Sequence, residues 1–378
     1  MRSLMSRAAV VATAAGALLI RAAGVASASE AGQIPAARLK RWVVRRAGVL
    51  RAIVAVTASA ALFVVIAVAA LVLSAGQASA SPRGTNGQIT YDINSGNGVV
   101  TANPDGSHAR LLVPGICCGD FSPDGSKLVV PYLTADGRIE TATVNADGTG
   151  YTPFPIHDPT LNIGCSTGSW SPDGKRLTCE TWDDSNSTRN GVYTVSSADG
   201  SGLTRITSNP LGGHDVPGSY SPNGKRIVFI RYDANGNPAG MFVVNTNGGQ
   251  LRQILPTSAD LNMGVQSDWS PQGNEIIVSL HVTPNVFGSI WVVHADGTGL
   301  HEIHIRGLNC GASFSDPNGV GCHGVRWSPD GKKIIFAAGT AAAGVNIYTA
   351  NADGTGLTQV SFGGSDDDPA WGTHPLVH

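Results

Sequence analysis

A short motif, an aromatic residue followed by Ser-Pro-x-Gly, constrains the fold of this chain more than any other feature. It begins at five positions, Phe121, Trp170, Tyr220, Trp269 and Trp327. Trp371 continues the spacing but lacks the turn that follows the other anchors. Successive anchors are separated by 44 residues (327 to 371) to 58 residues (269 to 327), a period typical of one four-stranded propeller blade. The repeat therefore predicts a ring of blades.

A second motif alternates with the first. Six stretches of the type N-A-D-G start at residues 103, 145, 197, 245, 294 and 351. In Ser-Pro-Asp-Gly, Pro presets φ for a type I turn and Gly accepts the left-handed conformation, so the motif predicts a hairpin. The runs that follow it, such as KRIVFI (225–230) and KKIIFA (332–337), are apolar and β-branched. Such strands are covered on both faces, as between two blades.

Each unit is therefore expected to contain an aromatic inner strand, a hairpin turn, a buried strand, a third strand, the N-A-D-G turn and an outer strand. The strands predicted over 88–92, 98–103 and 108–113 correspond to the second, third and fourth strands of such a unit. Its missing first strand is supplied around Trp371. We predict an all-β, six-bladed β-propeller over 84–378, closed by pairing of the C-terminal strand with the N-terminal strands, which leaves no open edge.

The residues before this body have a different composition. The stretch 38–51 contains six basic residues, and the following 24 residues, 52–75, are uncharged and apolar, long enough to cross a hydrocarbon layer of about 30 Å as a helix. We expect 1–51 to be a cytoplasmic basic leader, or in part the product of a start codon placed too far upstream. The segment 52–75 is then a transmembrane anchor or the core of a signal peptide cleaved near Ala80, and the body is exported to the periplasm or cell envelope.

The charge of the body argues against nucleic acid as a partner. Residues 84–378 contain 15 Lys and Arg against 26 Asp and Glu, a net charge of −11. Binding to phosphate backbones requires clustered Lys and Arg, and the sequence has no basic stripe. We therefore expect an envelope protein, peptide or glycan as the partner, in addition to the membrane through the N-terminal segment.

The repeats resemble those of the TolB-like six-bladed β-propeller family, also called the PD40 or WD40-like repeat. The resemblance is carried by WSPDGKRL, YSPNGKRIVF, WSPDGKKIIF, IYTANADGTGLTQVS and DDDPAW, and it covers about residues 88–374. It implies the propeller fold and a role in the bacterial envelope. TolB itself has an α/β domain before its propeller, and the sequence here has no counterpart to that domain.

The six cysteines of an exported chain favour disulfides over a redox or zinc site. If Trp170 faces Arg176 in its hairpin, Cys165 is diagonal to Cys179 and within bridging reach. A bridge between Cys310 and Cys322 would staple the insertion GASFSDPNGVG. The adjacent Cys117 and Cys118 form a vicinal pair or reach neighbouring loops. The sequence alone leaves all fifteen pairings open.

Variable segments precede the six aromatic anchors and are expected to meet at one mouth of the central channel. The residues predicted to bind a ligand there are Asp120, His214, Asp215, Asp268, His323, Asp366, Asp367 and Asp368. A ring of carboxylates and imidazoles can hold a cationic group, a peptide terminus or a metal. The three adjacent carboxylates 366–368 would attract Ca²⁺ or a Lys or Arg side chain; the alternative is that these loop residues are solvated or cap their own turns.

No catalytic constellation is identified in the sequence, so we expect a binding protein. GCSTG (164–168) matches the nucleophile elbow, but it leads into an inner strand and a hairpin rather than a helix, and we interpret it as a glycine-rich loop. The alternative is an envelope hydrolase or lyase that uses His214, Asp215 and a bound cation. That alternative requires His214, His323 and the carboxylates 366–368 to converge on one cavity.

Overall fold

The computed structural model describes residues 85–93, 97–133, 139–154, 162–165, 170–183, 186–257, 262–281, 287–313, 315–340 and 344–378. The basic leader, the apolar run 52–75 and the cleavage point near Ala80 lie outside these residues. Within the described ranges, no helix has the length and apolar character needed to cross a membrane.

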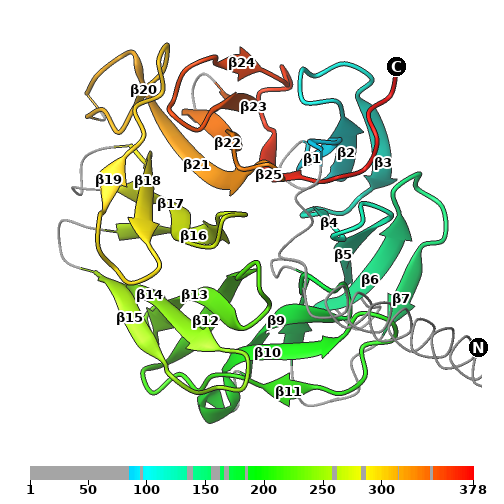
Figure 1. Ribbon diagram of the computed structural model, residues 1–378, viewed down its shortest axis with the longest axis vertical. Coiled ribbons are helices and arrows are strands. Elements are labelled where there is room, and N and C mark those ends of the chain that lie inside the picture. The colour runs from blue at the N-terminus through cyan, green and yellow to red at the C-terminus, as the bar shows by residue number, and fades with distance from the viewer. Residues whose placement is uncertain are drawn as a thin grey trace, which may run out of the picture. The chain divides into compact units, whose positions relative to one another are not determined.

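Six sheets are arranged around a central axis, as the repeat predicts (Figure 1). From the centre outwards, blade 1 contains β25 (Asp367–Trp371), β1 (Ile89–Asp92), β2 (Gly98–Ala102) and β3 (Arg110–Pro114). Blade 2 contains β4 (Asp120–Phe121), β5 (Lys127–Leu133), β6 (Ile139–Asn145) and β7 (Thr152–Phe154). Blade 3 contains β8 (Asn162–Gly164), β9 (Arg176–Trp182), β10 (Gly191–Ser196) and β11 (Thr204–Arg205), with a 3₁₀ turn η1 (Ser187–Arg189) before β10.

The other three blades repeat this order. Blade 4 contains β12 (Gly212–Tyr220), β13 (Arg226–Asp233), β14 (Pro238–Asn245) and β15 (Arg252–Pro256). Blade 5 contains β16 (Asn262–Trp269), β17 (Glu275–His281), β18 (Ser289–His294) and β19 (His301–Glu302). Blade 6 contains β21 (Gly319–Trp327), β22 (Lys333–Thr340), β23 (Gly344–Asn351) and β24 (Thr358–Gln359), and β20 (Asn309–Cys310) pairs in parallel with the start of β21.

The ring closes where the sequence predicts. Strand β25 pairs antiparallel with β1, with Trp371 opposite Ile89. The indole of Trp371 donates a hydrogen bond to the Gly87 carbonyl (3.1 Å). Beyond the strand, the Gln88 amide donates to the His374 carbonyl (2.8 Å). The two ends of the propeller are therefore held together by backbone and side-chain hydrogen bonds within blade 1.

The hairpin turns are built around the serine of Ser-Pro-x-Gly. In the turn that follows Trp170, the Ser171 amide donates to the Arg176 carbonyl (2.8 Å), and the Ser171 hydroxyl oxygen accepts from the Arg176 amide (2.9 Å). Ser171 and Arg176 thus close the hairpin, and Trp170 pairs with Leu177. The predicted register, with Trp170 opposite Arg176, was wrong because the serine rather than the aromatic residue closes the loop.

The hydrophobic core is divided among the spaces between blades. Six clusters of buried residues each join two neighbouring blades. The second strands supply most of the largest fully buried side chains, among them Phe229 in β13 and Phe336 in β22. These strands are covered on both faces, as their uninterrupted apolar runs predict. Each blade is therefore stabilised mainly by its two neighbours.

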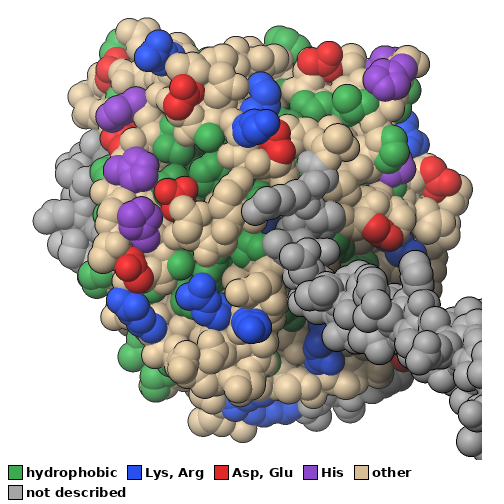
Figure 2. All heavy atoms as spheres, viewed as in Figure 1, with side chains coloured by type: hydrophobic (Ala, Val, Ile, Leu, Met, Phe, Trp, Pro, Cys, Tyr) green, Lys and Arg blue, Asp and Glu red, His purple; other side chains and the backbone are tan. Residues whose placement is uncertain are grey.

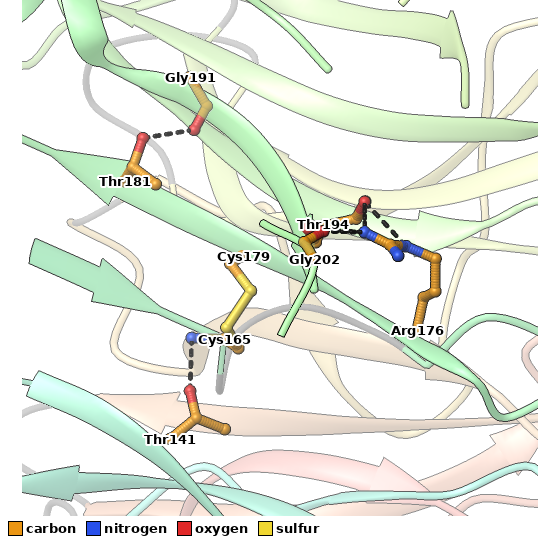
Figure 3. The surroundings of a disulfide bond; sticks show 8 residues. All are labelled: Thr141, Cys165, Arg176, Cys179, Thr181, Gly191, Thr194 and Gly202. Atoms are coloured by element: carbon orange, nitrogen blue, oxygen red, sulfur yellow. Dashed lines mark hydrogen bonds between the residues drawn. A yellow bond between two sulfur atoms is a disulfide. The ribbon is translucent and has the colours of Figure 1, made fainter. Parts of the chain in front are cut away.

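All six cysteines form disulfides, which pair Cys117 with Cys118, Cys165 with Cys179 and Cys310 with Cys322. The second links β8 to β9 (Figure 3). Gly164 pairs with Glu180, so the next residues inward, Cys165 and Cys179, face each other. The Cys165 amide also donates to the Thr141 hydroxyl of blade 2 (3.3 Å), and this contact connects the two blades.

Removal of the closing strand tests this architecture. We expect deletion of residues 369–378 to lower the midpoint of thermal unfolding strongly and to cause aggregation, because it exposes the free edge of β1. Trp371→Ala, which removes only a buried side chain, should cost about 3 to 5 kcal/mol of unfolding free energy. Circular dichroism melts measure both. Deletion of exposed His378 alone is the control, and an unchanged melting midpoint in the long deletion would contradict closure by β25.

Candidate functional site

The loops that connect the blades emerge at one end of the propeller. The strands within each blade are antiparallel, so the blade-to-blade loops share that end with the loops between second and third strands. The Ser-Pro-x-Gly and N-A-D-G turns lie at the opposite end. A pocket of about 440 Å³ opens among the former loops, where blades 6 and 1 meet. We call it the acidic mouth and define it by Asp92, Cys117, Asp366, Asp367 and Asp368.

The three adjacent carboxylates line this mouth but have different partners. Asp366 is 2% exposed and accepts a hydrogen bond from the Gly363 amide (3.0 Å), so it caps a turn of its own loop. Asp367 contacts the His323 imidazole, with 3.2 Å between Nε2 and Oδ1. Asp368 accepts a hydrogen bond from the Gln266 amide across the channel. Asp367 and Asp368 are thus the members of the trio that are available to a ligand.

His323 and Asp367 shift each other's pKa toward the charged forms. Burial alone would lower the pKa of His323, but the hydrogen bond and charge of Asp367 raise it above its usual value. Burial likewise acts to raise the pKa of Asp367, but the hydrogen bond and charge of His323 hold it below the usual range. Asp368 has no such cation in contact, and burial and the Asp367 charge raise its pKa. The negative charge of the mouth is therefore only partly neutralised.

Asp92, at the end of β1, is a mouth residue that the sequence reasoning missed. It is 4% exposed, and its Oδ1 atom is buried without a hydrogen-bond partner. Burial, together with the charges of Asp368 and Asp367, raises the pKa of Asp92 to about 8. One feature of the sequence could have identified it: Asp92 lies in β1, the strand that pairs with β25. In that ladder it is opposite Asp367.

The vicinal disulfide forms the next part of the wall. Cys118 Sγ lies 3.3 Å from Asp368 Oδ2, a contact rather than a hydrogen bond because a disulfide sulfur carries no hydrogen. Cys118 (φ 64°) and Asp368 (φ 44°) both adopt the left-handed backbone conformation that is uncommon outside glycine. In the described chain, two other non-glycine residues do so, and both occupy a glycine position of the N-A-D-G-x-G turns, His108 and Gln250. Unfavourable backbone conformations outside the repeat turns therefore collect at the mouth.

Deeper in the channel, two further predicted residues face a basic one. Asp120, Asp268 and Arg326 line a cavity of about 130 Å³ together with the aromatic anchors. Burial raises the pKa of Asp120 to about 6, an effect that the Arg326 charge reduces and the Asp268 charge adds to. Asp268 accepts a hydrogen bond from the Trp327 amide (2.9 Å), and burial raises its pKa as well. Arg326, which sequence reasoning did not select, partly compensates these two carboxylates.

The structure does not place Asp215 at the mouth. Its side chain is 0% exposed, accepts hydrogen bonds from Arg231 Nε (2.7 Å) and Nη2 (2.8 Å), and accepts a third from Thr207 Oγ1 (2.6 Å). Both of its oxygens are therefore bonded within the protein, to Arg231 of blade 4 and to Thr207 at the end of blade 3, so the prediction of a ligand-binding Asp215 is corrected. Strand alternation explains the difference, since Asp215 pairs with Arg231 across the β12–β13 ladder.

His214 belongs to a separate cluster. Its Nε2 lies 3.7 Å from Glu180 Oε1, and its ring stacks on Tyr232 at 5.1 Å between centroids. Burial lowers the pKa of His214, and burial with the Asp215 charge raises that of Glu180 to about 7. His214 thus contacts blades 3 and 4, whereas His323 contacts Asp367. The two histidines do not share one cluster of contacts.

The residues that could hold a metal differ from those predicted. Among the described residues, one group of acidic, histidine or cysteine side chains has its ligand atoms within 4.8 Å of one another, and it consists of Asp92, Cys117 and Cys118. The carboxylates 366–368, which the sequence suggests for Ca²⁺, bond to three different partners instead. In GCSTG, residues 166–168 lie outside the described chain, and Cys165 is held in a disulfide.

No family model matches the chain. Among solved structures, it is similar to TolB from Acinetobacter baumannii (TM-score 0.56, 18% identity, 75% of this chain and 66% of that one). It is also similar to a putative TolB from Agrobacterium tumefaciens (TM-score 0.53, 17% identity, 73% and 88%) and to Kuenenia stuttgartiensis hydrazine synthase (0.55, 14%, 79% and 49%). The chain thus spans just under two thirds of the length of the Acinetobacter protein. The resemblance to TolB propellers is confirmed for the fold.

The corrected role of Asp215 gives a test. We expect Asp215→Asn to lower the unfolding free energy by about 3 to 5 kcal/mol, because it leaves the Arg231 charge buried without its counterion. Urea unfolding followed by tryptophan fluorescence measures the change. Asp233→Asn, in the exposed hairpin turn of the same blade, is the comparison and should cost much less. Equal effects of the two changes would show that the buried pair is not structural.

The raised pKa of Asp120 gives a second test. A carboxyl group with a raised folded-state pKa adds stability below its unfolded pKa, and that stability is lost as the pH rises through about 6. Asp120→Asn should therefore stabilise the protein by about 1 kcal/mol near neutral pH, a figure reduced for screening by channel water, and by much less near pH 4.

Urea unfolding at the two pH values measures this difference. Asp147, in an exposed N-A-D-G turn, has a pKa lowered by hydrogen bonds from Thr149. Asp147→Asn should accordingly have the opposite sign at neutral pH. A gain from Asp120→Asn that does not depend on pH would exclude titration of this carboxyl as its cause.

Proposed function

We propose that this protein is an exported β-propeller of the cell envelope that binds a protein or peptide partner at the acidic mouth. The mouth receives a cationic group of the partner, either a Lys or Arg side chain or an amino terminus. The observation that carries this proposal is the grouping of the Asp92, Asp367 and Asp368 carboxylates on one pocket of about 440 Å³.

The electrostatics of the mouth support a cationic ligand. His323 contacts Asp367, and the charge of Arg326 acts on Asp368, so two basic side chains compensate the group in part. Burial and mutual repulsion raise the pKa values of Asp92 and Asp368, so their charged forms are disfavoured in the free protein. An ammonium or guanidinium group would relieve that repulsion and donate hydrogen bonds to oxygens that water reaches poorly.

The disulfides support an oxidising, extracytoplasmic compartment for this protein. All six cysteines are paired in disulfides, which form and persist mainly in oxidising compartments such as the periplasm or cell exterior. The basic and apolar sequence segments over 38–75 agree with this compartment, since they would serve as an export signal or anchor. The face shown in Figure 2 has acidic and basic side chains interspersed, without the continuous basic surface that a nucleic acid would need.

The contacts favour binding over the hydrolase or lyase alternative. That alternative needs His214, His323 and the acidic trio around one reacting centre. His214 instead contacts Glu180 and Tyr232, and Asp215 is buried against Arg231. A rigid ring with charged loops at its mouth is suited to recognition, for which no general base or nucleophile is required.

A peptide-binding assay tests the proposal. The full-length protein is titrated into fluorescent peptides of equal length that contain lysine and arginine, glutamate, or only neutral residues, and anisotropy reports binding. We expect selective binding of the cationic peptides. Replacing Asp367 and Asp368 together by Asn should weaken it at least tenfold, since buried charge-assisted hydrogen bonds are each worth about 1.5 to 3 kcal/mol.

The matched control is Asp353→Asn, which removes an exposed carboxylate from an N-A-D-G turn at the opposite end of the propeller. It should leave the affinity unchanged. Equal binding of cationic and neutral peptides, or equal affinities of the control and the double variant, would reject the acidic mouth as the binding site. Selective retention of a glycan in a parallel glycan-array experiment would replace the peptide partner with a sugar.

A further inference from the structure

The Cys117–Cys118 disulfide does little for the stability of the fold. It joins adjacent residues, whereas Cys165–Cys179 and Cys310–Cys322 close loops of sequence separation 14 and 12. A disulfide stabilises a protein mainly by restricting the unfolded chain, by about 3 kcal/mol for a loop of some fifteen residues and less for shorter loops. Stapling of the chain therefore does not account for the vicinal bond.

The same disulfide is the one that a reductant reaches most easily. Both of its residues are partly exposed, and Cys117 lines the acidic mouth. Cys165 and Cys179 are both 0% exposed, and in the third disulfide Cys322 is 0% exposed while Cys310 is partly exposed. Reduction requires direct attack on a sulfur atom, and access decides which bond reacts first. We therefore expect a limiting amount of reductant to open the vicinal bond, with two partly exposed cysteines, before the Cys310–Cys322 bond, with one, and before the buried Cys165–Cys179 bond.

The two sulfur atoms already lie beside an oxygen ligand. One oxygen of Asp92 and the Sγ atoms of Cys117 and Cys118 are within 4.8 Å of one another. Asp92 is 4% exposed, and its Oδ1 atom has no hydrogen-bond partner. A buried carboxylate oxygen without a partner is costly unless a donor or a cation satisfies it. Asp368 Oδ2 lies 3.3 Å from Cys118 Sγ but does not belong to this group of three.

We propose that reduction of the Cys117–Cys118 disulfide converts the acidic mouth into a site for one borderline-soft divalent cation of the Zn²⁺ type, bound by Cys117, Cys118 and Asp92. The fourth position of a tetrahedral site would be taken by water. Two thiolates and a carboxylate are ligands that Zn²⁺ accepts, and neither sulfur can act as a thiolate while the disulfide is intact. The site is therefore controlled by redox state and needs no partner protein.

The proposed steps balance. A dithiol reductant, such as a thioredoxin-type protein or a small dithiol, gives two electrons and two protons to the Cys117–Cys118 bond and becomes a disulfide itself. The protein now has two thiol groups. Binding of the divalent cation replaces the two thiol protons, which pass to solvent, so affinity increases as the pH rises through the thiol pKa range.

The test uses Co²⁺ as the probe, since cobalt bound to thiolates absorbs strongly where Zn²⁺ does not. The full-length protein is treated with a limiting amount of a phosphine reductant, which is oxidised to its oxide by taking oxygen from water. Alkylation and mass spectrometry then count the free thiols and locate them. We expect free thiols at positions 117 and 118, thiolate-to-cobalt absorption that saturates at one ion per chain, and loss of that absorption when Zn²⁺ is added.

Variants and controls make the outcome decisive. The untreated protein should show no thiolate-to-cobalt absorption, and Asp92→Asn should weaken Co²⁺ binding to the reduced protein at least tenfold. The Asp353→Asn variant, altered far from the mouth, should bind Co²⁺ with the same affinity as the unmodified protein. The Cys117→Ser/Cys118→Ser variant should bind no cobalt; if it fails to fold, the Asp92→Asn comparison decides alone.

Three results would overturn the proposal. The first is the absence of thiolate-to-cobalt absorption from protein shown to have both thiols free. The second is an unchanged affinity in Asp92→Asn. The third is opening of Cys165–Cys179 or Cys310–Cys322 before the vicinal bond, which would contradict the order of access. None of these results bears on peptide binding by the oxidised protein, so the two proposals fail separately.

Discussion

The pairing of β25 with β1 is the interaction on which the rest of the structure depends. A blade of this kind buries its apolar faces only against its neighbours, as the six interblade clusters show. If the ring were open, blade 1 would lose its packing against one of its two neighbours, blade 2 or blade 6. The apolar faces of that interface would then be exposed. The ladder between β1 and β25, with the Trp371 indole bonded to Gly87, therefore stabilises every interface indirectly.

The same strand positions the candidate site. Asp367 and Asp368 are the first residues of β25, and Asp92 is the last residue of β1. Pairing of the two strands brings three carboxylates together against the Cys117–Cys118 loop, where burial and, after it, the charges of Asp368 and Asp367 raise the pKa of Asp92. Closure thus stabilises the fold. At the end of the β1–β25 ladder, it also holds like charges closer together than is favourable in water.

The blades, their order and the closure could be predicted from the sequence because turn chemistry and strand periodicity are local signals that the repeat multiplies. The details that failed depend on register. Bulges in β12 shift its pairing with β13, so the sequence did not show that Asp215 would face Arg231 instead of the channel. Asp92 was missed because the carboxylates that raise its pKa, Asp367 and Asp368, lie near the other end of the chain. They approach it only through the pairing of β1 with β25.

The closing contact joins residues 284 positions apart in the chain, as the bond from Trp371 to Gly87 shows. Contacts of such separation cost more loop-closure entropy than the local hairpins, so we expect them to form after the hairpins and the blades between them. The carboxylates at the mouth come together only when β25 pairs with β1. A chain with five ordered blades and an open ring would expose apolar surface yet lack the acidic mouth, so a partner that recognised the mouth would select molecules whose ring has closed.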